Sequence, residues 1–327
     1  MMHGGNVWQG SSPETWLDFS ANLRPEGPPE WVLRTIAQAL PRMRYYPDLS
    51  MREARRGLAA YAGVDESCIL PTPGGIAAID LALRLDTGPV RVRKTTFGEY
   101  ARRCAVLNRE TVNVREPVNA GETLILCNPN NPTGTALSRK ELLDLHRRIS
   151  ARGGKLMVDE AFIDYCPERS VRKDVCDTLT VAGSLTKILC IPGVRLGYVC
   201  ASPEHIAMLE KLALPWQLGF AASAVAAALP DHLDGIRRDA EKNAERRLKM
   251  MSDLKSLNVY VQPSQANFLL CRFDRSMRDI VEELKERRIL VRTCASFGLP
   301  DSWLRLAVRT EDENRRLIEE LKRCLKL

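Results

Sequence analysis

The sequence predicts an α/β protein with a large domain on a mainly parallel sheet, followed by a smaller α+β domain at the C-terminal end. Through the middle of the chain, short apolar runs rich in β-branched residues alternate with amphipathic stretches, which is typical of strands and helices around a parallel sheet. Beyond about residue 258 the rhythm of the pattern changes. At 327 residues the chain also exceeds the usual size of one domain.

Four apolar runs in the large domain are predicted to be buried strands, at residues 123–127, 155–158, 178–181 and 196–200. Two helix starts are marked by a serine followed three residues later by a glutamate: Ser50 with Glu53 and Ser138 with Glu141. The uncharged run 212–230 contains Pro215, so we expect a buried or intersubunit helix there and no membrane span.

The smaller domain is predicted to follow a long charged helix at about 231–257. It should contain strands at 266–271, 289–291 and 304–308 and helices at 277–287 and 311–325. We expect an N-terminal segment, 1–45, that packs on the small domain or on a partner subunit, a large domain at 46–235, and a small domain at 236–327.

Composition indicates a globular, cytoplasmic protein. The net charge of +7 is spread over segments of mixed sign, so nucleic-acid binding has little support. Ten cysteines without a Cys-x-x-Cys pair indicate reduced thiols, and the four histidines lack the spacing of metal ligands. The first ten residues do not have the pattern of a signal peptide.

One motif predicts the chemistry. Ser184 lies three residues before Lys187, and Arg195 follows eight residues after it. A lysine in this setting can hold an aldehyde as a Schiff base while the hydroxyl and the guanidinium bind a phosphate, which is what pyridoxal phosphate requires. Asp159, at the end of a predicted strand, can keep the pyridine nitrogen protonated, and Asn131 can donate to the ring oxygen.

A glycine loop before a predicted helix supplies a second phosphate element. The backbone amides of Gly74, Gly75 and Ile76 can cradle the phosphate together with Ser184 and Arg195. Each of these features alone also fits ordinary turns, helix caps or solvated side chains. Their joint order along the chain is what favours a cofactor site.

This order resembles fold-type I, aspartate-aminotransferase-like pyridoxal-phosphate enzymes, and in particular the branch that contains histidinol-phosphate aminotransferase and the threonine-phosphate decarboxylase of cobalamin biosynthesis. The resemblance runs from about residue 3 to 309. It implies that Lys187 carries the cofactor, that Asp159, Asn131, Ser184 and Arg195 bind it, and that Tyr46 reaches the cofactor phosphate of a partner subunit. A homodimer follows from this last role.

The resemblance also implies where the substrate binds. Phe97, or Tyr100 as the other candidate, is expected to stack on the cofactor ring. Arg305 matches the arginine for the substrate carboxylate, and Arg292 matches one that this branch uses for a substrate phosphate, although a surface ion pair is the ordinary interpretation of Arg292. His3 and Asn22 are further candidates for phosphate contacts, and a histidine so near the terminus is equally compatible with a mobile side chain.

Three segments favour the decarboxylase over the aminotransferase: 3–6, 18–22 and 159–164. Phe162 stands where the aminotransferase commonly has a tyrosine, so Asn131 is left with more of the ring-oxygen contact. Residues 23–26, Leu-Arg-Pro-Glu, depart from the Ile-Asn-Pro-Leu of the decarboxylase and place a charged pair at the expected substrate entrance. The function predicted is decarboxylation of L-threonine O-3-phosphate to (R)-1-amino-2-propanol O-2-phosphate. Serine phosphate, a histidinol-phosphate-type transamination and a catalytically inactive scaffold remain alternatives.

Overall fold

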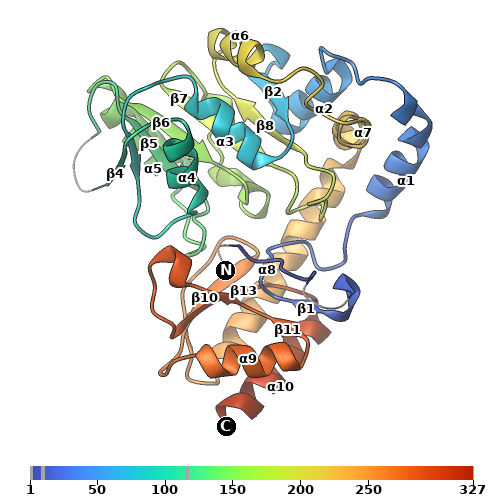
Figure 1. Cartoon of the computed structure of the whole chain (residues 1–327), viewed down its shortest axis with the longest axis vertical. Coiled ribbons are helices and arrows are strands. Elements are labelled where there is room, and N and C mark those ends of the chain that lie inside the picture. The colour runs from blue at the N-terminus through green and yellow to red at the C-terminus, as the bar shows by residue number, and fades with distance from the viewer. Residues whose placement is uncertain (1–2, 9–11, 115–117, 327) are drawn as a thin grey trace.

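The computed structural model describes residues 3–8, 12–114 and 118–326. Two lobes lie one above the other, and the long helix α8 (Leu233–Lys255) runs between them (Figure 1). The upper lobe holds a seven-stranded sheet, and the lower lobe holds a four-stranded sheet with two helices. The α/β fold and the mainly parallel large sheet are confirmed.

The large sheet has the strand order β2-β8-β7-β6-β5-β3-β4. The strands are β2 (Ile69–Thr72), β3 (Val90–Val92), β4 (Thr111–Asn113), β5 (Thr123–Cys127), β6 (Lys155–Asp159), β7 (Leu179–Ser184) and β8 (Gly197–Cys200). Strands β4, β3, β5, β6 and β7 are parallel, and β8 is antiparallel to both of its neighbours. The carboxyl ends of β5, β6 and β7 therefore lie side by side, where parallel sheets place ligands.

Successive residues of a strand point to opposite faces of the sheet, and in this sheet the residues of both faces are mostly apolar. Helices therefore cover both faces. Leu124 and Leu126 of β5 pack in one core with α1 (Glu30–Ala39), α2 (Arg52–Ala62), α5 (Arg139–Ser150) and α7 (Phe220–Ala228). Ile125 and Cys127 pack in the opposite core with α3 (Gly75–Leu83), α4 (Glu99–Val106) and α6 (Pro203–Leu212). Helix α5 begins with the predicted capping box of Ser138 and Glu141.

The small lobe is an antiparallel sheet of order β12-β13-β10-β9. Its elements are β9 (Tyr260–Val261), β10 (Phe268–Arg272), β12 (Arg292–Thr293) and β13 (Trp303–Ala307), with helices α9 (Arg278–Glu286) and α10 (Glu311–Leu325). A separate parallel pair joins β1 (Leu17–Asp18) to β11 (Ile289–Leu290), so an early segment of the chain is bound to this lobe.

Helix α8 crosses the predicted domain boundary at residues 235 and 236. Ile236 and Ala240, in its first half, belong to the core of the large lobe, and Met250 and Leu254, in its second half, belong to the core of the small lobe. Because one helix is buried in both cores, the position of the boundary stays a prediction.

Two local predictions were wrong. Ser50 does not cap helix α2: Met51 holds the cap position with φ of 49°, and the Asp48 carboxylate accepts the backbone N–H of Arg52 instead. The uncharged run 212–230 is not one helix either, because α6 ends at Leu212 and α7 begins only at Phe220. Among the described residues, no helix combines the length and the apolar character that crossing a bilayer requires.

Candidate active site

A cavity of about 1240 Å³ lies between the lobes and brings most of the predicted site residues together. It is lined from the large lobe by Ile76, Phe97, Asn131, Lys187 and Arg195, and from the N-terminal segment and the small lobe by His3, Asn22, Arg292 and Arg305. A second pocket of about 100 Å³ shares several of these residues and adds Gly75, Asp159 and Ser184. Residues up to 302 positions apart in the sequence thus face one space.

Lys187 lies three residues beyond the end of β7 and lines both pockets. Its Nζ donates to Thr186 Oγ1 at 2.6 Å. Burial, together with the nearby positive charges of Arg195 and Arg305, lowers the pKa of Lys187 to about 8, although the Asp159 carboxylate opposes this shift. An amine with this pKa is partly uncharged near neutral pH, which a nucleophile toward an aldehyde requires.

Asp159 is the last residue of β6 and is only 3% exposed. Burial raises the pKa of Asp159, and the hydrogen bond from Tyr100 works in the opposite direction. The Tyr100 hydroxyl donates to Oδ2 at 2.5 Å, the Ala161 N–H donates to Oδ1 at 2.9 Å, and the Cys127 thiol lies 3.8 Å from Oδ2. A buried carboxylate held by these donors fits a positively charged pyridine nitrogen.

The glycine loop lies against the residues predicted to bind phosphate. Gly74 caps α3 with φ of +89°, and a Cβ there would be 2.6 Å from Arg195 Nη2. A Cβ on Gly75 would be 3.0 Å from the Ser184 Cβ, so the loop packs closely against the two side chains, and the positive φ of Gly74 favours glycine there. The Gly74 N–H donates to Thr72 O and is engaged within the chain, whereas the amides of Gly75 and Ile76 lie in the first turn of α3. Their contact with a phosphate stays a prediction.

Phe97 and Tyr100 take different positions. Phe97 lines both pockets, and the Tyr100 ring meets it edge-on with 5.6 Å between centroids. Because the Tyr100 hydroxyl is committed to Asp159, the geometry favours Phe97 as the stacking residue. Phe162 also lines both pockets and is apolar there, while Asn131 Oδ1 accepts a hydrogen bond from Arg305 at 2.6 Å.

The two substrate arginines lie directly opposite each other. Arg292 on β12 pairs in register with Arg305 on β13, so their side chains leave the same face of the sheet. They are 4% and 6% exposed, so the interpretation of Arg292 as a surface ion pair is wrong. Burial, followed by the charge of Arg292, lowers the pKa of Arg305 to about 10, and burial also lowers the pKa of Arg292. Two buried cations facing one cavity favour an anion between them.

The N-terminal candidates also lie at the cavity. Asn22 is 5% exposed, and its Oδ1 is buried without a hydrogen-bond partner among the described residues. His3 Nε2 lies 2.9 Å from Oε1 of Glu99, a buried carboxylate on the cavity wall. Sequence reasoning missed Glu99, as it missed Thr186 and the bond from Tyr100 to Asp159. The position of Tyr100, three residues after Phe97, was the one available signal for the last of these.

Tyr46 lies away from the cavity. Its side chain is 80% exposed and its ring is 4.7 Å from that of Trp216. It lines a separate hollow of about 670 Å³ with Tyr45 and Phe220. Within one subunit, Tyr46 is not part of the cavity, and its predicted role in a partner's site stays a prediction.

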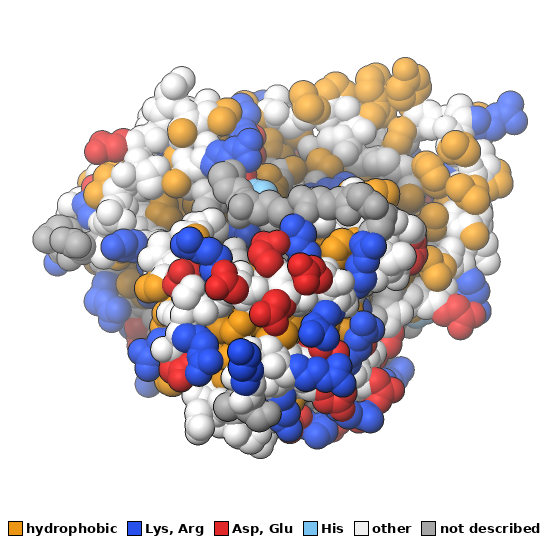
Figure 2. Space-filling model, turned by 60° about the horizontal axis from the view of Figure 1, so that its bottom comes forward, with side chains coloured by type: hydrophobic (Ala, Val, Ile, Leu, Met, Phe, Trp, Pro, Cys, Tyr) orange, Lys and Arg blue, Asp and Glu red, His pale blue; other side chains and the backbone are white. Residues whose placement is uncertain are grey.

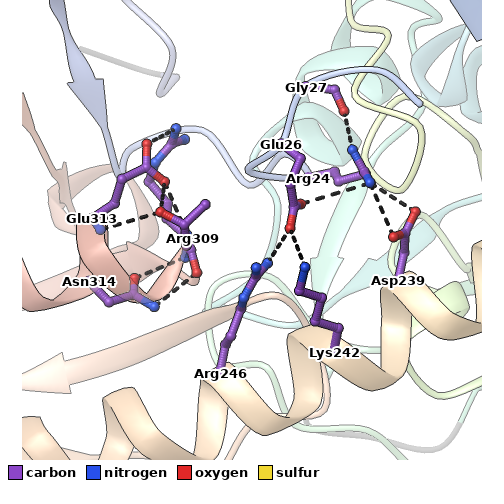
Figure 3. A network of polar contacts seen from close by, with 10 residues as sticks. Arg24, Glu26, Gly27, Asp239, Lys242, Arg246, Arg309, Glu313 and Asn314 are labelled. Atoms are coloured by element: carbon purple, nitrogen blue, oxygen red, sulfur yellow. Dashed lines mark hydrogen bonds and ion pairs between the residues drawn. The ribbon is translucent and has the colours of Figure 1, made fainter. Parts of the chain in front are cut away.

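The charged pair expected at the substrate entrance is not there. Arg24 and Glu26 do not line the cavity and turn toward α8, as Figure 3 shows. Arg24 Nε donates to Asp239 at 2.8 Å, and Glu26 accepts from Arg246 Nη1 at 2.6 Å. The prediction was wrong because α8 supplies opposite charges for both. The Arg24 N–H also donates to the Lys187 carbonyl at 3.0 Å, so this segment is tied to the backbone of the lysine.

Residues 14–321 match the model of the aminotransferase class I and II family. The chain belongs to this family. It is 32% identical to a threonine-phosphate decarboxylase of Salmonella typhimurium, over 99% of this chain and 96% of that protein. It is also 32% identical to a histidinol-phosphate aminotransferase of Mycobacterium tuberculosis, over 90% and 84% of the two chains.

A solved structure has the same fold. The histidinol-phosphate aminotransferase of Sinorhizobium meliloti, in complex with pyridoxal-5'-phosphate, superimposes with a TM-score of 0.84 at 20% identity, covering 94% of this chain and 89% of that one. The predicted family and its cofactor, pyridoxal 5'-phosphate, are confirmed. The buried carboxylate, the lysine of lowered pKa and the glycine loop fit this cofactor. A decarboxylase and an aminotransferase are equally close, so the reaction itself is not decided by similarity.

Proposed function

We propose that the chain is a cytoplasmic, homodimeric pyridoxal-phosphate enzyme that decarboxylates L-threonine O-3-phosphate to (R)-1-amino-2-propanol O-2-phosphate, a reaction of cobalamin biosynthesis. The observation that carries the proposal is the buried pair of Arg292 and Arg305, which face each other across two strands. A substrate with both a carboxylate and a phosphate supplies two anionic groups for two guanidinium groups.

The residues of the large lobe would bind the cofactor. Lys187 would hold its aldehyde, Asp159 would keep a proton on the pyridine nitrogen, and Asn131 would contact the ring oxygen. Gly75, Ile76, Ser184 and Arg195 would bind the phosphate, Gly74 would keep the loop close to Arg195, and Phe97 would stack on the ring. When bound, the cofactor supplies an electron sink for the pair left at Cα.

The residues around the substrate would decide which bond breaks. Arg305 and Arg292 would orient the two anionic groups, with His3 and Asn22 beside the phosphate. Decarboxylation requires the bond from Cα to the carboxylate to stand perpendicular to the ring, whereas transamination requires the Cα–H bond there. Lys187, with a pKa near 8, is suited to return a proton to Cα after carbon dioxide leaves.

The homodimer is supported by the exposed apolar side chains around Tyr46. Leu33, Leu40, Met43, Tyr45, Leu49, Leu214 and Trp216 are among the large hydrophobic residues left exposed in one subunit. In Figure 2 hydrophobic side chains gather along the upper right edge, whereas the face of the small lobe toward the viewer carries mixed charges. A second copy would cover such a surface and bring Tyr46 to the neighbouring cofactor phosphate. Sedimentation of the purified protein tests this directly.

The deciding assay incubates the enzyme with threonine phosphate and measures carbon dioxide and the amino-alcohol phosphate. We expect release of carbon dioxide without any keto acid. Transfer of an amino group from histidinol phosphate to a keto acid, without release of carbon dioxide, would replace this proposal with the aminotransferase. The similarity to the histidinol-phosphate aminotransferase of Mycobacterium tuberculosis favours that alternative. A panel that includes serine phosphate tests the size of the substrate, since one methyl group is worth only about 1–3 kcal/mol.

A scaffold without catalysis is the remaining alternative. The complete set of cofactor residues argues against it. A protein that binds the cofactor but turns over none of a broad panel of amines would favour it.

A further inference from the structure

Residues 3–8 form a wall of the substrate cavity, and we call them the N-terminal strap. His3, Gly4, Gly5, Val7 and Trp8 line the main cavity. His3, Gly4 and Asn6 also line a side pocket of about 200 Å³, together with Arg292. The strap therefore lies beside the arginine proposed to bind the substrate phosphate.

On the small-lobe side, the strap is held by Ser20. The Gly5 N–H donates to Ser20 Oγ at 2.8 Å, and that hydroxyl donates to Asp18 Oδ1 at 2.6 Å. A Cβ on Gly4 would be 2.1 Å from the Ser20 carbonyl oxygen, so the two backbones touch and no side chain fits between them. Arg305 Nη2 donates to the same carbonyl at 2.6 Å. The strap and a substrate arginine are thus positioned by one residue.

On the large-lobe side, the strap is held by Glu99, the first residue of α4. Its Oε1 lies 2.9 Å from His3 Nε2, and its side chain is only 10% exposed. The His3 imidazole is 6.2 Å from the Phe97 ring, tilted by 60°. The bond to Glu99 consequently keeps an imidazole of the chain itself next to the ring that is proposed to stack on the cofactor.

We propose that Glu99 is a specificity-determining positioning residue, which selects a compact phosphorylated side chain by holding His3 across the cavity. This role of Glu99 rests on the proposed function, and it would limit the size of the substrate side chain that the enzyme accepts. A short side chain leaves the strap in place. A substrate that carries its own ring, such as histidinol phosphate, must displace the imidazole and break its bond to Glu99.

The test compares the binding of the two ligand classes to the holoenzyme. Apparent dissociation constants for threonine phosphate and for histidinol phosphate are measured from the absorbance change of the bound cofactor on rapid mixing, before turnover. In Glu99→Ala, we expect the preference for the compact ligand to fall about tenfold, the effect of one lost charge-assisted hydrogen bond. Glu99→Gln keeps an oxygen acceptor for the imidazole N–H but loses the charge, so its preference should lie between those of Glu99→Ala and wild type.

Arg103→Gln is the matched control. Arg103 lies on the same helix and donates to Asp80 at 2.7 Å, but it does not line the cavity, so its loss should leave the preference unchanged. In His3→Ala the preference should fall at least as far as in Glu99→Ala, because this change removes the imidazole itself and not only its contact with Glu99. Hydrogen exchange of residues 4–8 should become faster in Glu99→Ala and not in Arg103→Gln, which reports on the strap apart from turnover.

The outcomes separate this proposal from the proposed function. If wild type releases carbon dioxide but the preference is the same in Glu99→Ala, the role of Glu99 is overturned and the decarboxylase stands. If no carbon dioxide appears but the preference falls in Glu99→Ala alone, the decarboxylase fails and the strap stands. A preference that falls equally in Arg103→Gln also overturns the role of Glu99, because the effect would then come from a general disturbance of α4.

Discussion

The two ends of the cavity differ in their charges: one holds a pair of opposite charge, and the other holds a pair of like charge. At the cofactor end, Lys187 and Asp159 carry opposite charges, and their side chains are held by hydroxyl, amide and thiol groups of the chain. At the substrate end, Arg292 and Arg305 carry like charges, and Arg305 Nε is buried without a partner among the described residues. The first end is nearly complete within the chain. At the second, an anionic ligand would add negative charge between two guanidinium groups.

This difference indicates that the ligand-free protein is destabilised at the substrate end, where the two arginines are buried. Burying two guanidinium groups opposite each other is unfavourable, and the pKa of Arg305 is lowered first by burial and then by the charge of Arg292. The cost is recovered when an anion enters. We therefore expect changes at the cofactor end to remove the chemistry, and changes at the substrate end to alter affinity while improving stability.

The largest effect is expected from Lys187→Ala. Loss of the amine removes both the covalent attachment of the cofactor and the proposed proton donor, so turnover should fall on the order of 10⁴-fold or more. Product formation from threonine phosphate measures this, and mass analysis after borohydride treatment checks that the cofactor adduct on residue 187 is gone. Turnover within tenfold of wild type would contradict the role of the lysine.

Arg292→Leu should affect substrate binding without affecting cofactor binding. We expect KM for threonine phosphate to rise about 100-fold, since a buried charge-assisted contact is lost, and cofactor affinity to stay unchanged. The substrate-free protein should gain roughly 1 kcal/mol of unfolding free energy because the repulsion of Arg305 is removed. Arg272→Leu, an exposed arginine on β10 of the same sheet, is the control and should change neither quantity. A loss of stability in Arg292→Leu would contradict the claim that repulsion between the two arginines destabilises the substrate-free protein.

The cofactor end was readable from the sequence because its residues sit in short motifs beside strands. The predicted strand 123–127 matches β5 residue for residue, and Asp159 ends β6 as expected. Strand β2 was missed because Pro71 lies within it. Proline removes a ladder donor, and β2 tolerates it at the edge of the sheet.

The substrate end was readable only through the family resemblance. That Arg292 and Arg305 face each other depends on the register of β12 and β13, which no local pattern reveals. The contact of His3 with Glu99 joins residues 96 positions apart. The turn of Arg24 and Glu26 toward α8 depends on how a separate helix packs, so the charges alone suggested the wrong neighbour.

The pH dependence of stability tests the burial of the lysine in cofactor-free protein. Its pKa in the folded state, about 8, lies below the ordinary value of 10.5, so the folded state binds fewer protons between these limits. Stability contributed by this group is therefore lowest below pH 8 and rises with pH through that window. Lys187→Met should exceed wild type in unfolding free energy by about 3 kcal/mol at pH 7. The gap should narrow at higher pH in denaturant titrations, and a gap that is constant with pH would argue against a lowered pKa.

The smallest effect, about tenfold in kcat, is expected from Tyr100→Phe, which removes one hydrogen bond from a buried carboxylate. Since that bond lowers the pKa of Asp159, its loss should raise this pKa further, and activity that needs the ionised carboxylate should fail at a higher pH on the acidic side. KM should change little. Tyr61→Phe is the matched control, because Tyr61 is also buried and donates to the buried Asp164 outside the cavity. If both variants shift the acidic limb of the pH profile alike, the hydrogen bond from Tyr100 does not set the pKa of Asp159. The charge balance at the cofactor end then does not depend on Tyr100.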